Sequence, residues 1–220
     1  MSSFLDTMLE RAKADKQTIV LPEGDDPRTL EAAETILAQG VANLIILGNV
    51  AAIKKSGRAL DGATLIDPQD SDLHDEFANT LYELRKHKGM TLEQAAEKVR
   101  DVLFFGVLMV KTGRADGMVS GACHSTGDVL RPSLQILKTA PGVKLVSSFF
   151  IMVVPNCEYG QNGTFLFSDC GLEIQPDAEK LAHIAVNSAQ SWKTLIGTEP
   201  VVAMLSHSTY GSAKNDDANK

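Results

Sequence analysis

The sequence predicts an α/β protein whose first domain contains a parallel β-sheet with helices on both faces. Three observations predict this fold class. Residues 18–22 and 43–47 are short, continuously apolar runs, which is typical of strands buried on both sides. Segments with helical periodicity separate these runs, and strands joined through helices are parallel. No repeat or low-complexity segment interrupts the pattern.

The first domain is expected to span residues 1–142, and local signals support its elements in order. The helix at 3–15 gathers its apolar side chains on one face. Gly40 ends the second helix, and Thr91 starts a later one with a glutamine in the capping-box position. The expected strands are 18–22, 43–47, 64–67 and 117–119, and the expected helices are 3–15, 28–39, 50–55, 71–87, 91–100, 102–112 and one that carries Arg131 near its start.

The second domain is expected to span residues 143–220. A long apolar strand over 143–154, a polar turn and a returning strand over 164–168 predict a hairpin, followed by a helix over 177–195 and a strand over 200–205. A Ser/Thr/Gly turn then brings Lys214 to the head of a further helix. A unit of this size that ends on a helix start is small and incomplete against usual domain sizes. We therefore expect the chain to be part of a longer protein.

Composition excludes several classes of function. The 220 residues are 44% hydrophobic and carry a formal net charge of −7, so a general nucleic-acid surface is not expected. The start has no charged segment followed by an apolar one, and the apolar stretch 102–110 is too short to span a bilayer. Three cysteines without a C-x-x-C pair argue against a disulfide framework and a zinc cage. The expectation is a cytoplasmic protein without metal, membrane or nucleic-acid partner.

Residues 117–139 carry the strongest functional signal. A short strand leads into the small-residue turn Ser120-Gly-Ala, then into His124, Ser125 and Thr126, and then into the helix with Arg131. Small residues let backbone amides approach a ligand, and a helix N-terminus attracts anions, so the segment is suited to phosphate. Turn formation and capping alone would also explain the serine and threonine. Arg131, expected in the first turn, opposes the helix dipole unless an anion lies nearby.

A second basic cluster occupies residues 85–88, at the end of an expected helix. Cations there complement the helix dipole, which is the simple structural explanation. The functional interpretation is a phosphate clamp, in which Arg85 and Arg131 hold one dianion from two sides. Cys157 follows an apolar strand as a structural or near-site thiol. Asp128 and Asp169 are expected to be cap or turn carboxylates rather than general bases.

Taken together, these segments resemble the phosphate acetyl/butyryltransferase family. The Gly-Ala-Cys-His-Ser-Thr run at 121–126 is one of several matching stretches that occur in the family's order. The acetyl members look closer than the butyryl members, chiefly through residues 82–89 and 155–160. The matching stretches are 18–23, 82–89, 116–126, 130–139, 155–160, 163–168 and 204–214.

The resemblance implies reversible transfer of an acetyl group between acetyl phosphate and coenzyme A, with release of phosphate and no bound cofactor. It implies homodimers of two-domain α/β subunits, with a fold like that of isocitrate and isopropylmalate dehydrogenases: a three-layer αβα domain and a second α/β domain, incomplete here. The coenzyme A thiol attacks the acyl carbonyl directly. The family's phosphate-binding arginines map onto Arg85 and Arg131, its Ser/Thr turn onto Ser125 and Thr126, and its near-site cysteine onto Cys157. We expect Arg85, Arg131 and Ser125 to be catalytic, and the substrates to be bound by Thr126, His124, Cys157 and Lys214.

The sequence departs from the family at one point. The family's general base comes from a segment near its C-terminus, which nothing in these 220 residues matches. We therefore expect the chain alone to turn over poorly or not at all. Three alternatives remain: a phosphate butyryltransferase, a non-catalytic acyl-phosphate or coenzyme A binding fragment, and a decarboxylating dehydrogenase, for which the required metal-binding carboxylates are not found.

Overall fold

The computed structural model describes residues 4–219, which form two compact units, one up to residue 138 and the other from residue 139. Ser3, where the first helix was expected to begin, and the outer ends of the two expected domains, Met1 and Lys220, lie outside the described residues. The predicted α/β class is confirmed. Within residues 4–219, no helix has both the length and the apolar composition needed to cross a bilayer.

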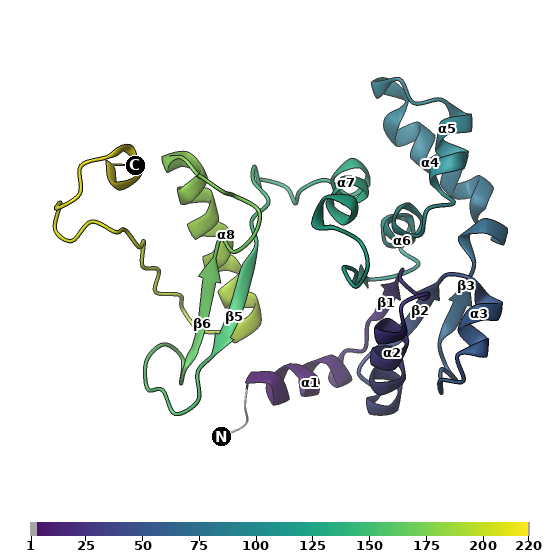
Figure 1. Cartoon of the computed structure of the whole chain (residues 1–220), viewed down its shortest axis with the longest axis horizontal. Helices are drawn as coiled ribbons and strands as arrows, with labels where there is room; N and C mark the ends of the chain where they lie inside the picture. Colours follow the sequence, from purple (N-terminus) through teal and green to yellow (C-terminus); the bar gives the residue numbers. More distant parts are fainter. Residues whose placement is uncertain (1–3, 220) are drawn as a thin grey trace. The chain divides into compact units, whose positions relative to one another are not determined.

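The first unit is built on a four-stranded parallel sheet in the order β3-β2-β1-β4 (Figure 1). Each strand arises where the sequence predicts one, and the two continuous apolar runs pair side by side, for example Val20 with Ile45. The strands are β1 (Thr18–Leu21), β2 (Asn43–Leu47), β3 (Thr64–Ile66) and β4 (Gly117–Met118).

Helices cover both faces of this sheet. Val20 and Ile45 point into one core, and helices α4 to α7 cover that core. Leu21 and Ile46, their neighbours in sequence, point into the opposite core against α2 and α3, because successive strand residues face opposite sides. The helices of the unit are α1 (Phe4–Ala14), α2 (Pro27–Gln39), α3 (Val50–Lys55), α4 (His74–Arg85), α5 (Leu92–Lys98), α6 (Val102–Lys111) and α7 (Thr126–Ile136).

The predicted helix boundaries hold where capping residues set them. Thr91 and Gln94 form the expected capping box at the start of α5, and Gly40 ends α2 in the left-handed conformation. The helix predicted over 71–87 is shorter in the structure, where α4 begins at His74 and ends at Arg85. A 3₁₀ turn over Lys86–Lys88 follows it.

The second unit contains the predicted hairpin and the predicted long helix. Strands β5 (Phe149–Val153) and β6 (Thr164–Ser168) pair in antiparallel register, with Ile151 opposite Leu166. Helix α8 (Ala178–Ile196) starts at the cap residue Asp177, and the short α9 (Asp216–Asn219) begins two residues after Lys214.

Two strands predicted for this unit are wrong: one is shorter than expected, and the other does not form in the described residues. Residues 143–148 do not continue β5, because the partner strand β6 ends at Ser168. The amide of Ser148 donates to the Asp169 carboxylate instead of to a strand. Residues 200–205 form no strand, since no described strand lies beside them to accept their hydrogen bonds. Val201 and Leu205 are accordingly almost fully exposed.

Asp169 ties the start of β5 to the turn that follows β6. Its carboxylate accepts hydrogen bonds from the amide and hydroxyl of Ser148, both at 2.8 Å, and from the amides of Gly171 and Leu172 at 2.7 and 2.8 Å. Burial raises the pKa of Asp169, but these hydrogen bonds lower it by more, so that it lies well below its usual range.

Replacing Asp169 by asparagine is expected to destabilise the second unit by about 2 kcal/mol at neutral pH. The NH₂ group of asparagine would face backbone N–H donors that now donate to a carboxylate oxygen. A carboxylate with a lowered pKa in the folded state stabilises it above the pKa of the unfolded chain, and this contribution disappears as pH falls. The difference between wild type and Asp169→Asn should therefore shrink below about pH 4. Urea unfolding followed by the fluorescence of Trp192, the single tryptophan, measures it. A difference independent of pH would contradict this role.

Candidate anion-binding site

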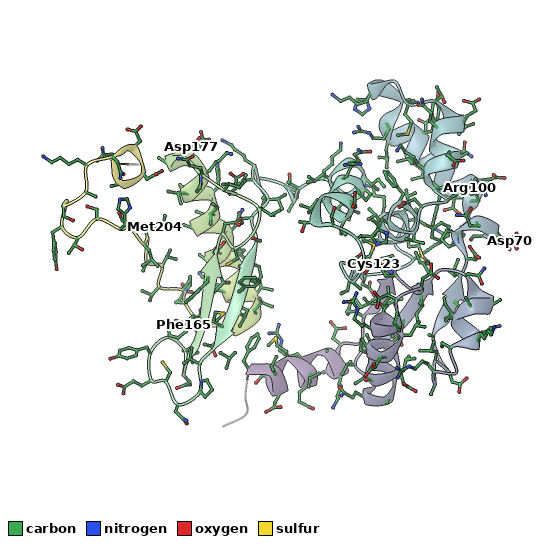
Figure 2. The ribbon with its side chains drawn as sticks, viewed as in Figure 1. Asp70, Arg100, Cys123, Phe165, Asp177 and Met204 are labelled. Carbon is green, nitrogen blue, oxygen red and sulfur yellow. The ribbon has the colours of Figure 1, made fainter. Side chains whose placement is uncertain are left out.

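The candidate site lies at the carboxyl ends of β1 and β4, which are neighbours in the parallel sheet. Glu23 follows β1, and the turn 120–125 follows β4, so the topology brings together residues about a hundred positions apart. Gly24, the next residue, packs closely against the end of β2, because a Cβ atom there would lie 2.5 Å from the carbonyl oxygen of Leu47. Figure 2 labels Cys123 of this turn beside the end of the sheet.

Glu23 organises the turn. Its side chain is 2% exposed, and its two carboxylate oxygens accept hydrogen bonds from the backbone amides of Gly121, Ala122, Cys123 and His124 at 2.8 to 3.0 Å. The Nδ1 atom of His124 lies 2.8 Å from the same carboxylate. Burial raises the pKa of Glu23, but these bonds together lower it far below its ordinary value. A permanent internal anion therefore holds the turn.

This arrangement corrects one part of the sequence interpretation. The small-residue turn was expected to let backbone amides approach a phosphate, but the amides of residues 121–124 already bind the Glu23 carboxylate. Within residues 4–219, the amides of Thr126 and Gly127 in the first turn of α7 make no hydrogen bond, so they are the donors that remain for an external anion.

Helix α7 begins earlier than expected, which changes the position of Arg131. Ser125 caps the helix, and its hydroxyl donates to the carboxylate of Asp128 at 2.6 Å and accepts from the Asp128 amide. Asp128 is thus a cap carboxylate, as predicted. Arg131 then stands in the second turn, so the predicted conflict with the dipole in the first turn is wrong. A side chain on a helix leans towards the N-terminus, which directs Arg131 towards the turn that contains Gly127.

Arg85 and Arg131 differ from the other five of the seven arginines. Arg28, Arg58 and Arg114 form salt bridges with carboxylates. Arg100 donates to a backbone carbonyl, and Arg11 contacts a methionine sulfur. Within residues 4–219, the Arg85 and Arg131 side chains have neither a hydrogen bond nor a salt bridge.

The lack of a hydrogen-bond partner for Arg85 within residues 4–219 is informative, because part of its side chain is buried. Arg85 is half-buried at the end of α4, and its Nε atom is buried without a partner among the described residues. A buried donor without a partner is rare in folded proteins. Helix α4 packs against α7, so both arginines belong to contacting elements of the first unit. Arg131 is exposed, and the carboxylate of Asp128 is its electrostatic neighbour.

The other predicted site residues divide between the two units. His124, Ser125 and Thr126 lie together at the start of α7 with Arg131. Cys157 and Lys214 belong to the second unit, where Cys157 is half-buried in the turn after β5 and Lys214 is exposed before α9. The resemblance remains the basis for their predicted roles.

Sequence reasoning missed Glu23. A carboxylate directly after the first buried strand, next to a glycine, was a usable signal, since side chains at the ends of parallel strands gather at one edge of the sheet. Cys123 was not predicted to react, and burial together with its hydrogen bond to Glu23 raises the pKa of its thiol. Cys123 is therefore a protonated thiol at neutral pH rather than a nucleophile.

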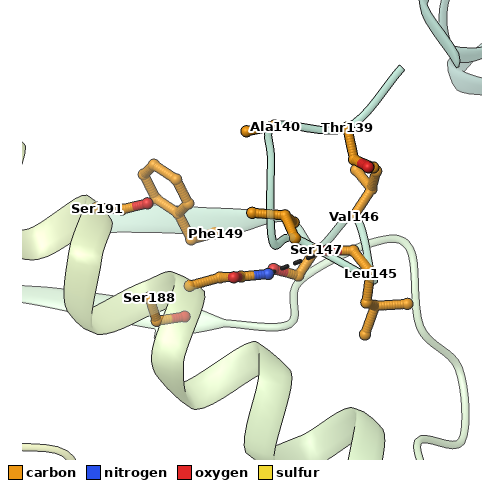
Figure 3. Close-up of a pocket in the computed structure, with 10 residues that line it drawn as sticks. Thr139, Ala140, Leu145, Val146, Ser147, Phe149, Ser188 and Ser191 are labelled. Carbon is orange, nitrogen blue, oxygen red and sulfur yellow. Dashed lines mark hydrogen bonds between the residues drawn. The ribbon is translucent and has the colours of Figure 1, made fainter.

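A separate pocket of about 210 Å³ lies in the second unit. Figure 3 shows Ser188 and Ser191 of α8 facing the segment that leads into β5, where Asn187 donates to the carbonyl oxygen of Leu145 at 3.0 Å. None of the predicted site residues lines this pocket.

Comparison with known proteins gives a consistent result. A family model described as phosphate acetyl/butaryl transferase matches residues 3–220. The chain is 54% identical over 220 residues to a phosphate acetyltransferase from Acetivibrio thermocellus, covering 99% of this chain and 66% of that protein. It is 55% identical to the phosphate acetyltransferase of Thermoanaerobacterium thermosaccharolyticum, covering 99% and 67%.

Solved structures agree with the sequence matches. A phosphotransacetylase from Streptococcus pyogenes aligns with a TM-score of 0.87 at 41% identity, covering 98% of this chain and 65% of that one. A phosphotransacetylase from Staphylococcus aureus aligns with a TM-score of 0.85, covering 99% and 64%. The chain therefore spans about two thirds of the length of the relatives that it matches.

Proposed function

The chain belongs to the phosphate acetyl/butaryl transferase family, and from this premise we propose that it is part of an enzyme that transfers an acetyl group reversibly between acetyl phosphate and coenzyme A. One observation supports the proposal above the others: within residues 4–219, Arg85 and Arg131 are the two arginines whose side chains form neither a hydrogen bond nor a salt bridge. The relatives named above are phosphate acetyltransferases, which favours the acetyl over the butyryl reaction.

In this proposal, the two guanidinium groups hold the phosphate of acetyl phosphate, which is a dianion and becomes the leaving group. The forked guanidinium binds two phosphate oxygens at once, and its charge stabilises the negative charge that develops as the carbon–oxygen bond breaks. The amides of Thr126 and Gly127 add donors at the positive end of α7. Ser125 keeps this end of the helix in place through its cap.

The remaining steps need groups from both substrates. The thiol of coenzyme A attacks the acyl carbonyl, and binding both substrates together supplies proximity. The thiol must lose its proton during the attack, which requires a base. We assign no base to this chain, in agreement with the departure from the family noted in the sequence. Thr126, His124, Cys157 and Lys214 are proposed to contact the substrates.

The proposal predicts that the 220-residue chain turns over poorly and that adding the part of a relative beyond the aligned region restores activity. A fusion in which residues 1–220 are followed by the portion of the Thermoanaerobacterium thermosaccharolyticum enzyme beyond the aligned region provides that part. We expect acetyl-coenzyme A formation by the fusion and at most weak formation by the chain, in one coupled assay with acetyl and butyryl phosphate.

Three outcomes would count against the proposal. Full activity of the isolated chain would contradict the expected need for a base from outside it. Preference for butyryl phosphate would favour the butyryl reaction. A folded fusion that binds acetyl phosphate without turnover would favour the non-catalytic binding fragment.

We also propose that the complete enzyme is a homodimer in the cytoplasm. Three free cysteines suit a reducing compartment. Phe150 of β5 and Phe167 of β6 are 59% and 55% exposed, and a second subunit would remove such apolar surface from water. Sedimentation of the fusion measures the subunit number.

A further inference from the structure

One cluster in the first unit joins a carboxylate, a thiol and an imidazole. The Sγ atom of Cys123 lies 3.5 Å from Oε1 of Glu23 and 3.6 Å from Nδ1 of His124. The Nδ1 atom lies 2.8 Å from the same Oε1 atom. Each pair of donor atoms is thus in direct contact, although Glu23 is a hundred residues away from the other two.

These distances fit a transition-metal ion. Zinc bonds to cysteine sulfur at about 2.3 Å and to histidine nitrogen or carboxylate oxygen at about 2.0 Å. In a tetrahedral site two such ligand atoms are therefore about 3.3 to 3.5 Å apart. The two distances from the sulfur already agree with this geometry, and the nitrogen and oxygen atoms need to separate by about half an ångström.

We propose that Glu23, Cys123 and His124 bind one divalent transition-metal ion of the zinc class. The ion takes the place of the hydrogen-bonding contacts that now join the three donor atoms. The thiol proton of Cys123 is released to solvent, and the neutral His124 ring carries its proton on Nε2 so that Nδ1 is free to coordinate. The sulfur and nitrogen donors favour zinc, cobalt, nickel or copper over magnesium and calcium, which prefer oxygen ligands.

The surroundings of the cluster support metal binding. The four backbone amides already fix the Glu23 carboxylate, so this ligand loses little freedom when the ion binds. Cys123 is exposed, and the His124 side chain is 28% exposed, so an ion reaches the cluster from solvent. Three protein ligands leave a fourth position for water. The inference rests on these contacts and does not depend on the proposed acetyl transfer.

Titration of the metal-free 220-residue chain with Co²⁺ tests the site. We expect one equivalent to bind with the visible absorption of a four-coordinate ion and a sulfur-to-cobalt charge-transfer band, and Zn²⁺ but not Mg²⁺ to displace it. Cys123→Ser should abolish the charge-transfer band and weaken binding at least tenfold. His124→Gln should weaken binding to a similar extent. Cys157→Ser and Cys170→Ser are matched controls and should change neither.

Several results would overturn the proposal. They are the absence of a charge-transfer band in the wild type, its survival in Cys123→Ser, or its loss in Cys157→Ser or Cys170→Ser. Circular dichroism of each variant establishes that it is folded. Proton release on binding is a second readout that does not depend on a variant: release of the thiol proton is expected near neutral pH, and no release would contradict coordination by the thiol.

Discussion

In the active fusion, replacing Arg131 or Arg85 by alanine is expected to lower kcat/KM for acetyl phosphate by about a hundred- to a thousandfold each. Within residues 4–219 neither guanidinium group forms a salt bridge, and the buried Nε of Arg85 has no acceptor. Each removal therefore leaves charge on the departing phosphate without its cation. A steady-state assay over a range of acetyl phosphate concentrations measures the effect.

A matched control is Arg58→Ala, which removes the same charge from a salt bridge with Glu31 and Glu34. It should leave kcat/KM nearly unchanged. Arg→Lys at positions 85 and 131 should recover part of the loss, because lysine supplies the charge without the fork. Equal losses in all three alanine variants would mean that net charge, rather than two specific contacts, governs the reaction.

Replacing Glu23 by alanine is expected to reduce the free energy of unfolding of the first unit by about 3 kcal/mol at neutral pH. The substitution removes the common acceptor of four backbone amides in residues 121–124, and the start of α7 loses its support. Chemical denaturation followed by circular dichroism measures the loss. Hydrogen exchange of these four amides should accelerate locally and identify its origin.

A small carboxylate should rescue this variant. The four amides of Glu23→Ala form an anion-binding cavity, which formate can fill. Added formate should therefore raise the melting temperature of the variant and slow exchange of amides 121–124, while wild type responds little. Sodium chloride at equal ionic strength is the control. Absence of rescue together with unchanged exchange in the variant would show that Glu23 does not hold the turn.

Local signals in the sequence predict most of the first unit. Two continuous apolar runs and two shorter apolar segments became the four parallel strands, and Thr91 and Gly40 set helix ends where expected. Prediction failed where a partner far along the chain decides the structure. Asp169 diverts the amide of Ser148, and residues 200–205 have no described strand beside them.

The candidate site shows the same division. Sequence reasoning identified the turn and helix of residues 120–131 and the basic end of α4, because glycine, serine and arginine mark them locally. It could not identify what occupies the amides of the turn, since Glu23 is a hundred residues away and reaches them only through the order of β1 and β4. It also misplaced Arg131. Ser125 and Asp128 form the cap of α7, so the helix begins earlier than expected and Arg131 falls in its second turn.

The central claim is that Arg85 and Arg131 bind the same phosphate group. Titration of the 220-residue chain with inorganic phosphate, followed by ³¹P resonance or calorimetry, tests it most directly. We predict one phosphate per chain, weakened by Arg85→Ala and by Arg131→Ala alike and unaffected by Arg58→Ala. Two independent phosphate sites, or a single site that responds to only one of the two arginines, would contradict it.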